Sequence, residues 1–306
     1  MLRRIVEITG EGKRLSLDRG FLTISNAEGH LGSVPLDDIE AVIAASPSVS
    51  YSGQLIDALA NRGAPLVICG NYYRPSVWML PVNGHHAQGE RMEAQAACSQ
   101  ALRKRLWSDL VTAKLEAQAQ ALAHAGRTFS PLRFMQREIR AGDPGNVEAR
   151  AAQFYFPELF GADFRRNRVL EGANSLLNYG YTVLRAATAR AIVAAGLHPS
   201  FGILHKSRGD AFRLADDLME PFRPTVDLEV LDLLAVGKQS LETDVKRRLA
   251  GLLQLDFQTP EGRTPLSSCL TRLSSSLAQI YTGERNALQL PSPLVRLPDD
   301  LGQASE

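Results

Sequence analysis

Residues 65–102, PLVICGNYYRPSVWMLPVNGHHAQGERMEAQAACSQAL, contain the point at which the character of the chain changes. Before the segment Asn83-Gly84-His85-His86, β-branched residues and turn residues dominate. After it, Ala, Leu, Arg and Glu dominate, and apolar residues recur with a helical period. The sequence therefore predicts an α+β protein of two domains, a small β-rich N-terminal domain followed by a larger all-helical C-terminal domain.

The domain boundaries follow from this change and from the proline content at the end of the chain. We expect an N-terminal domain at 1–82, a linker at 83–89, a helical domain at 90–289 and an extended tail at 290–306, which holds three prolines. The two adjacent histidines of the linker could be metal ligands. A polar linker is the favoured interpretation, because no partner ligand lies nearby in the sequence.

Short alternating runs and turn residues predict the strands, and longer periodic runs predict the helices. Strands are expected at 4–8, 14–18, 21–25, 39–45, 65–69 and 77–80, with one helix at 52–62 that Ser52 can cap. Asp18-Arg19-Gly20 is typical of a hairpin turn. Further helices are expected at 90–124, 132–141, 147–156, 167–195, 210–220, 225–235, 241–255 and 265–281.

Composition limits the class of protein without giving a function. The chain has 306 residues, of which 44% are hydrophobic and 22% charged, so it can bury a sizeable core. It has no apolar run of about 18 residues, and we therefore expect no membrane span. Three cysteines without metal-ligand spacing indicate reduced thiols and a cytoplasmic location. A formal net charge of +1 neither suggests nor excludes nucleic-acid binding.

Two acids in the stretch 207–223, SRGDAFRLADDLMEPFR, are candidates for chemistry. Asp217 and Glu220 lie three residues apart on a predicted helix that Pro221 ends. They can form a solvated face, with Asp217 paired to Arg213 one turn earlier. Alternatively, Glu220 at the helix end opposes the helix dipole, and a cation would relieve that unfavourable interaction.

His205 and Glu148 are the other candidates. His205 follows an apolar run and precedes basic residues, so it is either a core histidine or a ligand of a metal or phosphate. Glu148 falls in the first turn of a helix that Asn146 can cap, where the dipole favours an acid. Its face also holds Ala151 and Tyr155, however, and a carboxylate drawn toward a core requires a cation. Two carboxylates and one imidazole suit a divalent ion that keeps positions open for phosphate and water.

The chain resembles the CRISPR-associated integrase family, the subunit numbered one among CRISPR-associated proteins. The run 196–227, GLHPSFGILHKSRGDAFRLADDLMEPFRPTVD, contains the Gly-x-Leu-His step and the Leu-x-x-Asp-Leu-x-Glu-x-x-Arg-Pro helix of that family. EARAA at 148–152 and NSLLNYGY at 174–181 match two further family segments. Glu220 stands where many members have Asp. The form of the motif is most similar to members from systems with a single large effector nuclease.

This resemblance implies an activity and a site. The implied function is a metal-dependent DNA integrase and endonuclease of antiviral defence, which inserts new spacer DNA into a CRISPR array by attack of a 3′-hydroxyl. Glu148, His205 and Glu220 would be the catalytic residues and would bind Mg²⁺ or Mn²⁺, with Asp217 as an auxiliary acid. Weaker candidates, for DNA binding, are Asn178, Tyr181, Lys206, Arg208, Arg165, Arg166 and Arg168.

The resemblance also implies partners. These are double-stranded DNA, both spacer precursor and repeat, a second copy of the chain bound through residues 1–82, and a second, smaller adaptation subunit in a four-plus-two complex. The effector nuclease is a further expected partner. Two alternatives stay open at this point: a structure-selective nuclease that cuts branched DNA in repair, and a non-catalytic DNA-binding scaffold.

Overall fold

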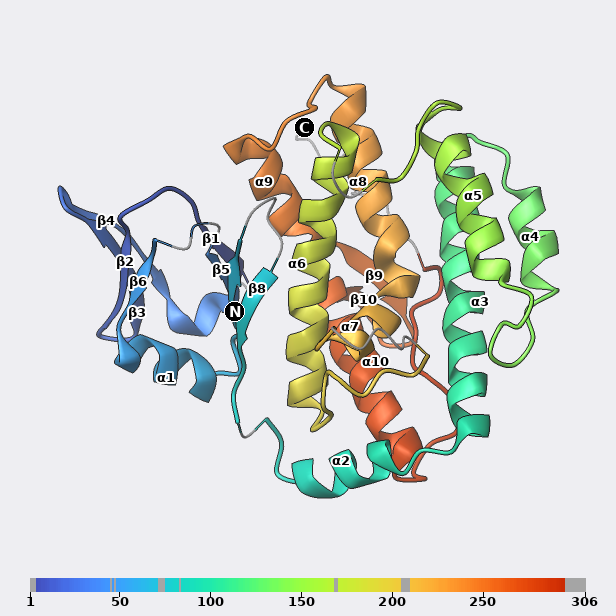
Figure 1. Cartoon of the computed structure of the whole chain (residues 1–306), viewed down its shortest axis with the longest axis horizontal. Coiled ribbons are helices and arrows are strands. Elements are labelled where there is room, and N and C mark those ends of the chain that lie inside the picture. The colour runs from blue at the N-terminus through green and yellow to red at the C-terminus, as the bar shows by residue number, and fades with distance from the viewer. Residues whose placement is uncertain are drawn as a thin grey trace, which may run out of the picture.

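The computed structural model describes residues 4–44, 46, 48–70, 75–82, 84–167, 170–204 and 210–294. Strands dominate the first part of the chain and helices the rest, which confirms the predicted α+β class (Figure 1). None of the helices described is long and apolar enough to cross a membrane. The following predicted features lie outside the described residues: His205, Lys206, Arg208, Arg168 and the tail from 295 onward.

Two four-stranded sheets form the N-terminal part. The first has the order β1-β5-β7-β8, with parallel pairing from β1 to β7 and an antiparallel last strand. The second has the order β4-β3-β2-β6, with β6 parallel to β2. The strands are β1 (Arg4–Ile8), β2 (Arg14–Asp18), β3 (Phe21–Asn26), β4 (Gly29–Pro35), β5 (Ile39–Ala44), β6 (Ser50–Tyr51), β7 (Leu66–Cys69) and β8 (Pro75–Met79).

Local sequence signals explain how these strands are joined. Arg19 and Gly20 adopt positive φ values of 46° and 86° in the β2–β3 hairpin, as the predicted turn requires. The side chain of Ser52 accepts a hydrogen bond from the Leu55 amide at 3.3 Å, which confirms the predicted cap of α1 (Gly53–Asn61). A short 3₁₀ turn at Leu36–Asp38 connects β4 to β5.

Strand β5 is buried along its whole length because both of its faces are covered. One face, with Val42, packs against a core that includes the second sheet and α1. The opposite face, with Ala41 and Ile43, belongs to the same core as the helices. Side chains of one strand alternate between faces, so β5 joins both cores. The domain boundary near residue 83 stays a prediction.

Polar contacts also connect the first sheet to the helices. Glu7 on β1 accepts a hydrogen bond from the Tyr179 hydroxyl at 2.8 Å and pairs with the Lys246 ammonium at 3.0 Å. Glu40 on β5 is buried and pairs with the Arg190 guanidinium at 2.7 Å. The first sheet is therefore attached to the helical part by packing and by ion pairs.

The helical part differs from the sequence-based expectation in several places. The predicted helices 132–141 and 241–255 end early, at Gln136 and Ala250, and the predicted helix 210–220 spans only Arg213–Leu218. The predicted helix 90–124 is wrong as one unit, because residues 97–99 break it and Ser99 caps the second piece. The predicted helix 167–195 begins only at Ala173. The all-helical expectation also missed a hairpin of β9 (Asp256–Thr259) and β10 (Gly262–Pro265). The observed helices are α2 (Gln88–Ala96), α3 (Gln100–His124), α4 (Ser130–Gln136), α5 (Val147–Phe160), α6 (Ala173–Ala194), α7 (Arg213–Leu218), α8 (Arg223–Ala235), α9 (Thr243–Ala250) and α10 (Leu266–Tyr281), with 3₁₀ turns η3 (Glu220–Phe222) and η4 (Gly251–Gln254).

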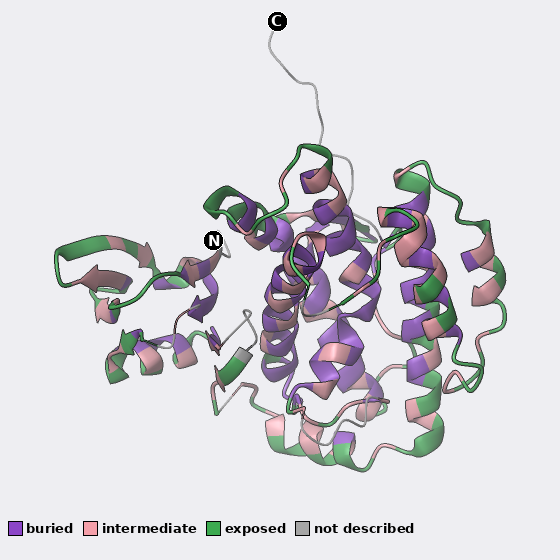
Figure 2. Cartoon of the chain, turned by 45° about the horizontal axis from the view of Figure 1, so that its top comes forward, coloured by how far each residue is buried: buried purple, intermediate pink, exposed green. Residues whose placement is uncertain are grey.

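Helix α6 lies between the sheets and the helices α8, α3 and α5 (Figure 1) and is mostly buried, as the colouring of Figure 2 shows. Its close approach to α8 depends on Gly180, because a Cβ at that position would lie 2.4 Å from Cγ1 of Val226. Helices α3 and α5 lie on the side of the bundle away from the sheets (Figure 1). This arrangement brings α3, α5 and η3 together, and these are the elements that carry the candidate site.

Candidate active site

Glu148 is the second residue of α5, and Asp143 fixes the start of that helix. The carboxylate of Asp143 accepts hydrogen bonds from the amides of Val147 at 2.9 Å and Glu148 at 3.0 Å. The predicted cap, Asn146, is wrong: its side chain makes no cap hydrogen bond, and its φ is 49°. The first turn of α5 is therefore held by a carboxylate that binds the amide of Glu148 itself.

Glu220 lies on η3, because α7 ends at Leu218 and Pro221 starts a short 3₁₀ turn before α8. The residue is only 4% exposed. Its Oε1 accepts a hydrogen bond from Nε of Arg223 at 2.8 Å. Helix α8 thus supplies a guanidinium beside Glu220, a protein cation that the sequence did not predict.

Lys114 of α3 joins the two glutamates. Its ammonium lies 2.6 Å from Oε1 of Glu148 and 2.6 Å from Oε2 of Glu220, and the residue is 9% exposed. Burial lowers the pKa of Lys114, but the carboxylates of Glu220 and Glu148 raise it by more, so the net pKa lies above its ordinary value. The lysine is therefore a cation held between two carboxylates that are 72 residues apart in the chain.

Lys114 was missed from the sequence, although a signal for it exists. It lies one turn after Leu110 and one turn before Ala117 and Gln118, all of which are buried. A lysine on the buried face of a helix needs a nearby carboxylate, because an unpaired charge in a core is costly. Sequence alone does not identify which carboxylate meets it.

Asp217 is fully buried and does not pair with Arg213 as predicted. Its Oδ2 accepts a hydrogen bond from the Ile203 amide at 2.5 Å. No hydrogen-bond partner for Nε of Arg213 is found among the described residues. Asp217 therefore fixes the backbone two residues before the position of His205, and its role as an auxiliary acid stays a prediction.

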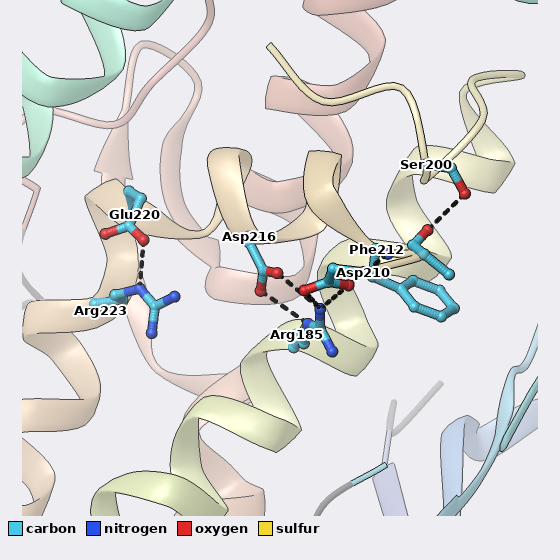
Figure 3. A network of polar contacts seen from close by, with 8 residues as sticks. Arg185, Ser200, Asp210, Phe212, Asp216, Glu220 and Arg223 are labelled. Atoms are coloured by element: carbon cyan, nitrogen blue, oxygen red, sulfur yellow. Dashed lines mark hydrogen bonds and ion pairs between the residues drawn. The ribbon is translucent and has the colours of Figure 1, made fainter. Parts of the chain in front are cut away.

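The described residues that follow the segment 205–209 are also held by side-chain contacts, as Figure 3 shows. The guanidinium of Arg185 on α6 lies 2.7 Å from a carboxylate oxygen of Asp210 and 2.7 Å from one of Asp216. The Ser200 hydroxyl donates to the carbonyl of Ala211 at 2.7 Å. Both described ends of the segment 205–209 are thus tied to the helices beside Glu220.

The donor set fits a divalent cation. The carboxylates of Glu148 and Glu220 converge from separate elements on one positively charged group, so the ammonium of Lys114 is at a position suited to a cation. Carboxylate oxygens are ligands that Mg²⁺ and Mn²⁺ accept. Within the part of the chain that the structure describes, no three His, Cys, Asp or Glu side chains gather, and the third predicted ligand, His205, is outside that part.

Two of the DNA-binding candidates that the structure describes, Arg166 and Tyr181, are linked to this site through Arg223. Arg166 donates to Asn174 at 2.9 Å and to Asn178 at 2.7 Å, and its guanidinium lies 5.4 Å from the centre of the Tyr181 ring. Arg223 lies 4.7 Å from the same ring. Arg165 is exposed and donates to two nearby backbone carbonyls. Contact of any of these side chains with DNA stays a prediction.

Tyr181 also belongs to a buried network that links three helices. Its hydroxyl and that of Tyr155 on α5 both donate to the carboxyl group of Asp227 on α8. Burial raises the pKa of Asp227 to about 6, although the two tyrosine hydrogen bonds act in the opposite direction. This network holds Tyr181 against α8, where its ring lies beside Arg223.

Comparison with known proteins places this arrangement in a family. Residues 6–256 match the family described as CRISPR associated protein Cas1. The chain is 36% identical over 287 residues to a CRISPR-associated endonuclease Cas1 of Neisseria meningitidis serogroup C, covering 92% of this chain and 93% of the relative.

Solved structures share the fold. A casposase bound to its integration product superposes with a TM-score of 0.80 at 20% identity, covering 97% of this chain and 96% of the casposase chain. A chain of a Cas6-RT-Cas1–Cas2 complex superposes with a TM-score of 0.74 at 18% identity, covering 93% of this chain and 35% of that one.

Proposed function

The chain belongs to the Cas1 family of CRISPR-associated proteins, and from this premise we propose that it is a metal-dependent integrase and endonuclease that inserts spacer DNA into a CRISPR array. The catalytic residues of the proposal are Glu148, His205 and Glu220. The nuclease class follows from the family, whose relative from Neisseria meningitidis is a CRISPR-associated endonuclease. The metal dependence and the residue roles are our proposal.

One observation carries the assignment of the site. Glu148 and Glu220 come from different elements and turn their carboxylates to the same cation, at 2.6 Å each. Glu220 is buried, and a buried carboxylate is retained only where a cation compensates the cost of its burial. Such a pair of carboxylates suits a divalent cation that binds the reacting phosphodiester.

The reaction is a transesterification at phosphorus. The 3′-hydroxyl of a spacer strand attacks a phosphodiester of the array, a new P–O bond forms, and the old P–O bond breaks to release a 3′-hydroxyl. A bound Mg²⁺ or Mn²⁺ would stabilise the added charge on the phosphate and lower the pKa of the attacking hydroxyl. Glu148, Glu220 and His205 would hold it. Asp217 would keep the backbone before His205 in place through the Ile203 amide.

Basic residues around this pair would hold the DNA backbone. Arg166 is linked to the site through the Tyr181 ring and Arg223, Arg165 is its exposed neighbour, and Lys206, Arg208 and Arg168 are further candidates from the sequence. Lys and Arg contacts to phosphates position DNA without reading its sequence, so we expect affinity to fall steeply with salt. Asn178 and Tyr181 would act mainly by holding Arg166 and Arg223 in place.

The proposal includes partners. A solved relative is part of a complex with Cas2, which supports a second, smaller adaptation subunit as partner of this chain. The integration product in the casposase structure supports double-stranded DNA as substrate. We further propose a homodimer formed through residues 1–82, a four-plus-two complex and contact with the effector nuclease. The two alternatives, a repair nuclease for branched DNA and a non-catalytic scaffold, gain no support from the comparisons.

Strand transfer into a supercoiled plasmid that carries a repeat tests the proposal. We expect joined product from the wild type with the smaller subunit in Mg²⁺ or Mn²⁺, and none from Glu148→Ala or in excess chelator. A branched-DNA junction offered in parallel distinguishes the repair nuclease. Efficient junction cleavage without any strand transfer would contradict the proposed function.

A further inference from the structure

Lys114 occupies the position between the carboxylates that a divalent cation needs. Its ammonium faces Oε1 of Glu148 and Oε2 of Glu220, while the other oxygen of Glu220 faces Arg223. These contacts join two negative groups, Glu148 and Glu220, with two positive groups, Lys114 and Arg223, so their formal charges sum to zero. The pair of glutamates therefore already has its charge compensated by the protein.

A divalent cation that enters this site meets two unfavourable terms. It must displace the ammonium from oxygens 2.6 Å away, and it then lies close to the positive charges of Lys114 and Arg223. The low exposure of Lys114 strengthens this repulsion, because little water screens it. The free protein is expected to bind divalent cations weakly.

A DNA phosphate changes this balance. A phosphate beside the glutamates adds a negative charge and offers the ammonium a new partner. The lysine side chain has a flexible four-carbon stem, so its ammonium can move while its backbone stays in the middle of α3. The cation and the phosphate then favour each other's binding, which is positive coupling between two ligands.

We propose that Lys114 is an internal counter-ion that holds Glu148 and Glu220 together in the free protein and moves to phosphate when DNA and a divalent cation bind. Lys114 thereby makes tight cation binding conditional on DNA. This inference rests on the proposed function of the same site. Its purpose is to keep the nuclease centre without a tightly bound cation until a substrate is present.

The test measures the affinity for Mn²⁺ from the electron paramagnetic resonance signal of the free ion, with full-length protein, with and without a duplex with splayed ends. Binding of Mn²⁺ by the duplex alone is subtracted. We expect the duplex to lower the Mn²⁺ dissociation constant of the wild type at least tenfold. In Lys114→Met we expect at least tenfold tighter binding without DNA than in the wild type, and a much smaller effect of the duplex.

Lys246→Met is the matched control, because Lys246 is also a buried lysine paired with a glutamate, Glu7, outside the candidate site. It should bind Mn²⁺ as the wild type does. Lys114→Arg keeps the charge and should keep weak binding without DNA. Lys114→Met that binds Mn²⁺ no tighter than the wild type overturns the inference. If Lys114→Met does not fold, the measurement on the wild type tests the inference by itself. Equal Mn²⁺ affinity of the wild type with and without the duplex also overturns the inference.

Failure of this inference and failure of the proposed function give different results. If strand transfer needs metal and Glu220 while Lys114→Met leaves Mn²⁺ affinity unchanged, only the inference fails. If Lys114→Met tightens Mn²⁺ binding while no strand transfer is seen, the function fails and the counter-ion role stands.

Discussion

At the scale of single residues, Glu220 has two positive partners among the residues that the structure describes, and it is only 4% exposed. Lys114 and Arg223 each contact one of its carboxylate oxygens. Without the buried carboxylate of Glu220, the positive charges of Lys114 and Arg223 would lie close together and lack the acid that they share. The residue is therefore a structural member of the bundle as well as a proposed ligand.

We predict that Glu220→Ala abolishes strand transfer and also lowers the free energy of unfolding in chelator. Removal of an unpaired acid from this helix end would leave the metal-free protein unharmed or more stable, but Glu220 is paired with Lys114 and Arg223. Removing one partner of a buried ion pair costs roughly 3 kcal/mol or more. Urea denaturation with and without chelator measures this.

The control for Glu220 is Glu138→Ala, whose carboxylate is 52% exposed and pairs with the exposed Arg150 at 2.7 Å. Surface pairs contribute about 0–1 kcal/mol, so this variant should unfold as the wild type does. If Glu220→Ala is as stable as the control, the contacts with Lys114 and Arg223 do not stabilise the protein.

The sequence predicted both carboxylates but neither of their cations. Family motifs predict Glu148 and Glu220 as site residues, whereas spacing alone leaves a solvated acid as the alternative. Lys114 lies in no such motif, and its meeting with Glu148 depends on how α3 packs against α5. Such a contact between residues 34 positions apart is set by tertiary packing and not by local pattern.

At the scale of elements, the start of α5 is the feature that orients Glu148. We predict that Asp143→Ala lowers stability by about 1–2 kcal/mol, because the first two amides of α5 lose the carboxylate that accepts their hydrogen bonds. It should also weaken Mn²⁺ binding and strand transfer, since the amide of Glu148 loses its acceptor. Chemical denaturation and Mn²⁺ titration in the presence of the duplex measure the two effects.

Ser99→Ala is the matched cap variant, because Ser99 caps α3 at its Leu102 amide, far along the helix from Lys114. It should lose a similar free energy of unfolding and keep Mn²⁺ binding. Equal loss of Mn²⁺ binding in both variants would mean that global stability, and not the orientation of Glu148, is responsible.

The tyrosine network between α5, α6 and α8 gives a prediction for pH. The folded pKa of Asp227 is about 6, above its ordinary value of 3.8. The unfolded chain therefore loses this proton first, and the contribution of Asp227 to stability falls as pH rises from about 4 to about 6. Asp227→Asn does not titrate, so it should lack this part of the pH dependence.

The comparison that isolates Asp227 is the difference in unfolding free energy between the wild type and Asp227→Asn at pH 4.5, 5.5 and 7. The free energy of unfolding of the wild type, relative to that of the variant, should be higher at pH 4.5 than at pH 7 by roughly 1–3 kcal/mol, since one pKa unit corresponds to 1.36 kcal/mol. Parallel pH curves for the two proteins would contradict a raised pKa of Asp227.

Elements were predicted well where periodicity and caps agree, and poorly where packing decides. Ser52 and the β2–β3 turn were read correctly because both signals are local. The hairpin of β9 and β10 was missed because its strands are only four residues long and lie between two helical patterns. The position of Asn146 predicts it as the cap, whereas Asp143, three residues earlier, binds the amides.

At the scale of the whole molecule, the shared core changes how the proposed homodimer is best tested. A chain cut before residue 90 would leave the helical surface that covers Ala41 and Ile43 exposed. Substitutions in the intact chain avoid this problem. We predict that Leu31→Asp, on the edge strand β4, converts the dimer to a monomer in sedimentation, because Leu31 is 51% exposed and an apolar edge favours pairing.

The matched variant is Val236→Asp, since Val236 is 67% exposed at the end of α8 in the helical part. It should sediment as the wild type does. A dimer that survives Leu31→Asp but not Val236→Asp would move the interface to the helical part.

The contacts of Glu7 and Glu40 with Tyr179, Lys246 and Arg190 make the first sheet and the helices one solid piece. Two copies that pair through their N-terminal parts, as proposed, would therefore hold their two pairs of carboxylates at a fixed distance from each other. That distance would set the length of repeat that the protein accepts. A weaker attachment of the first sheet to the helices should make the positions of the two insertions less uniform.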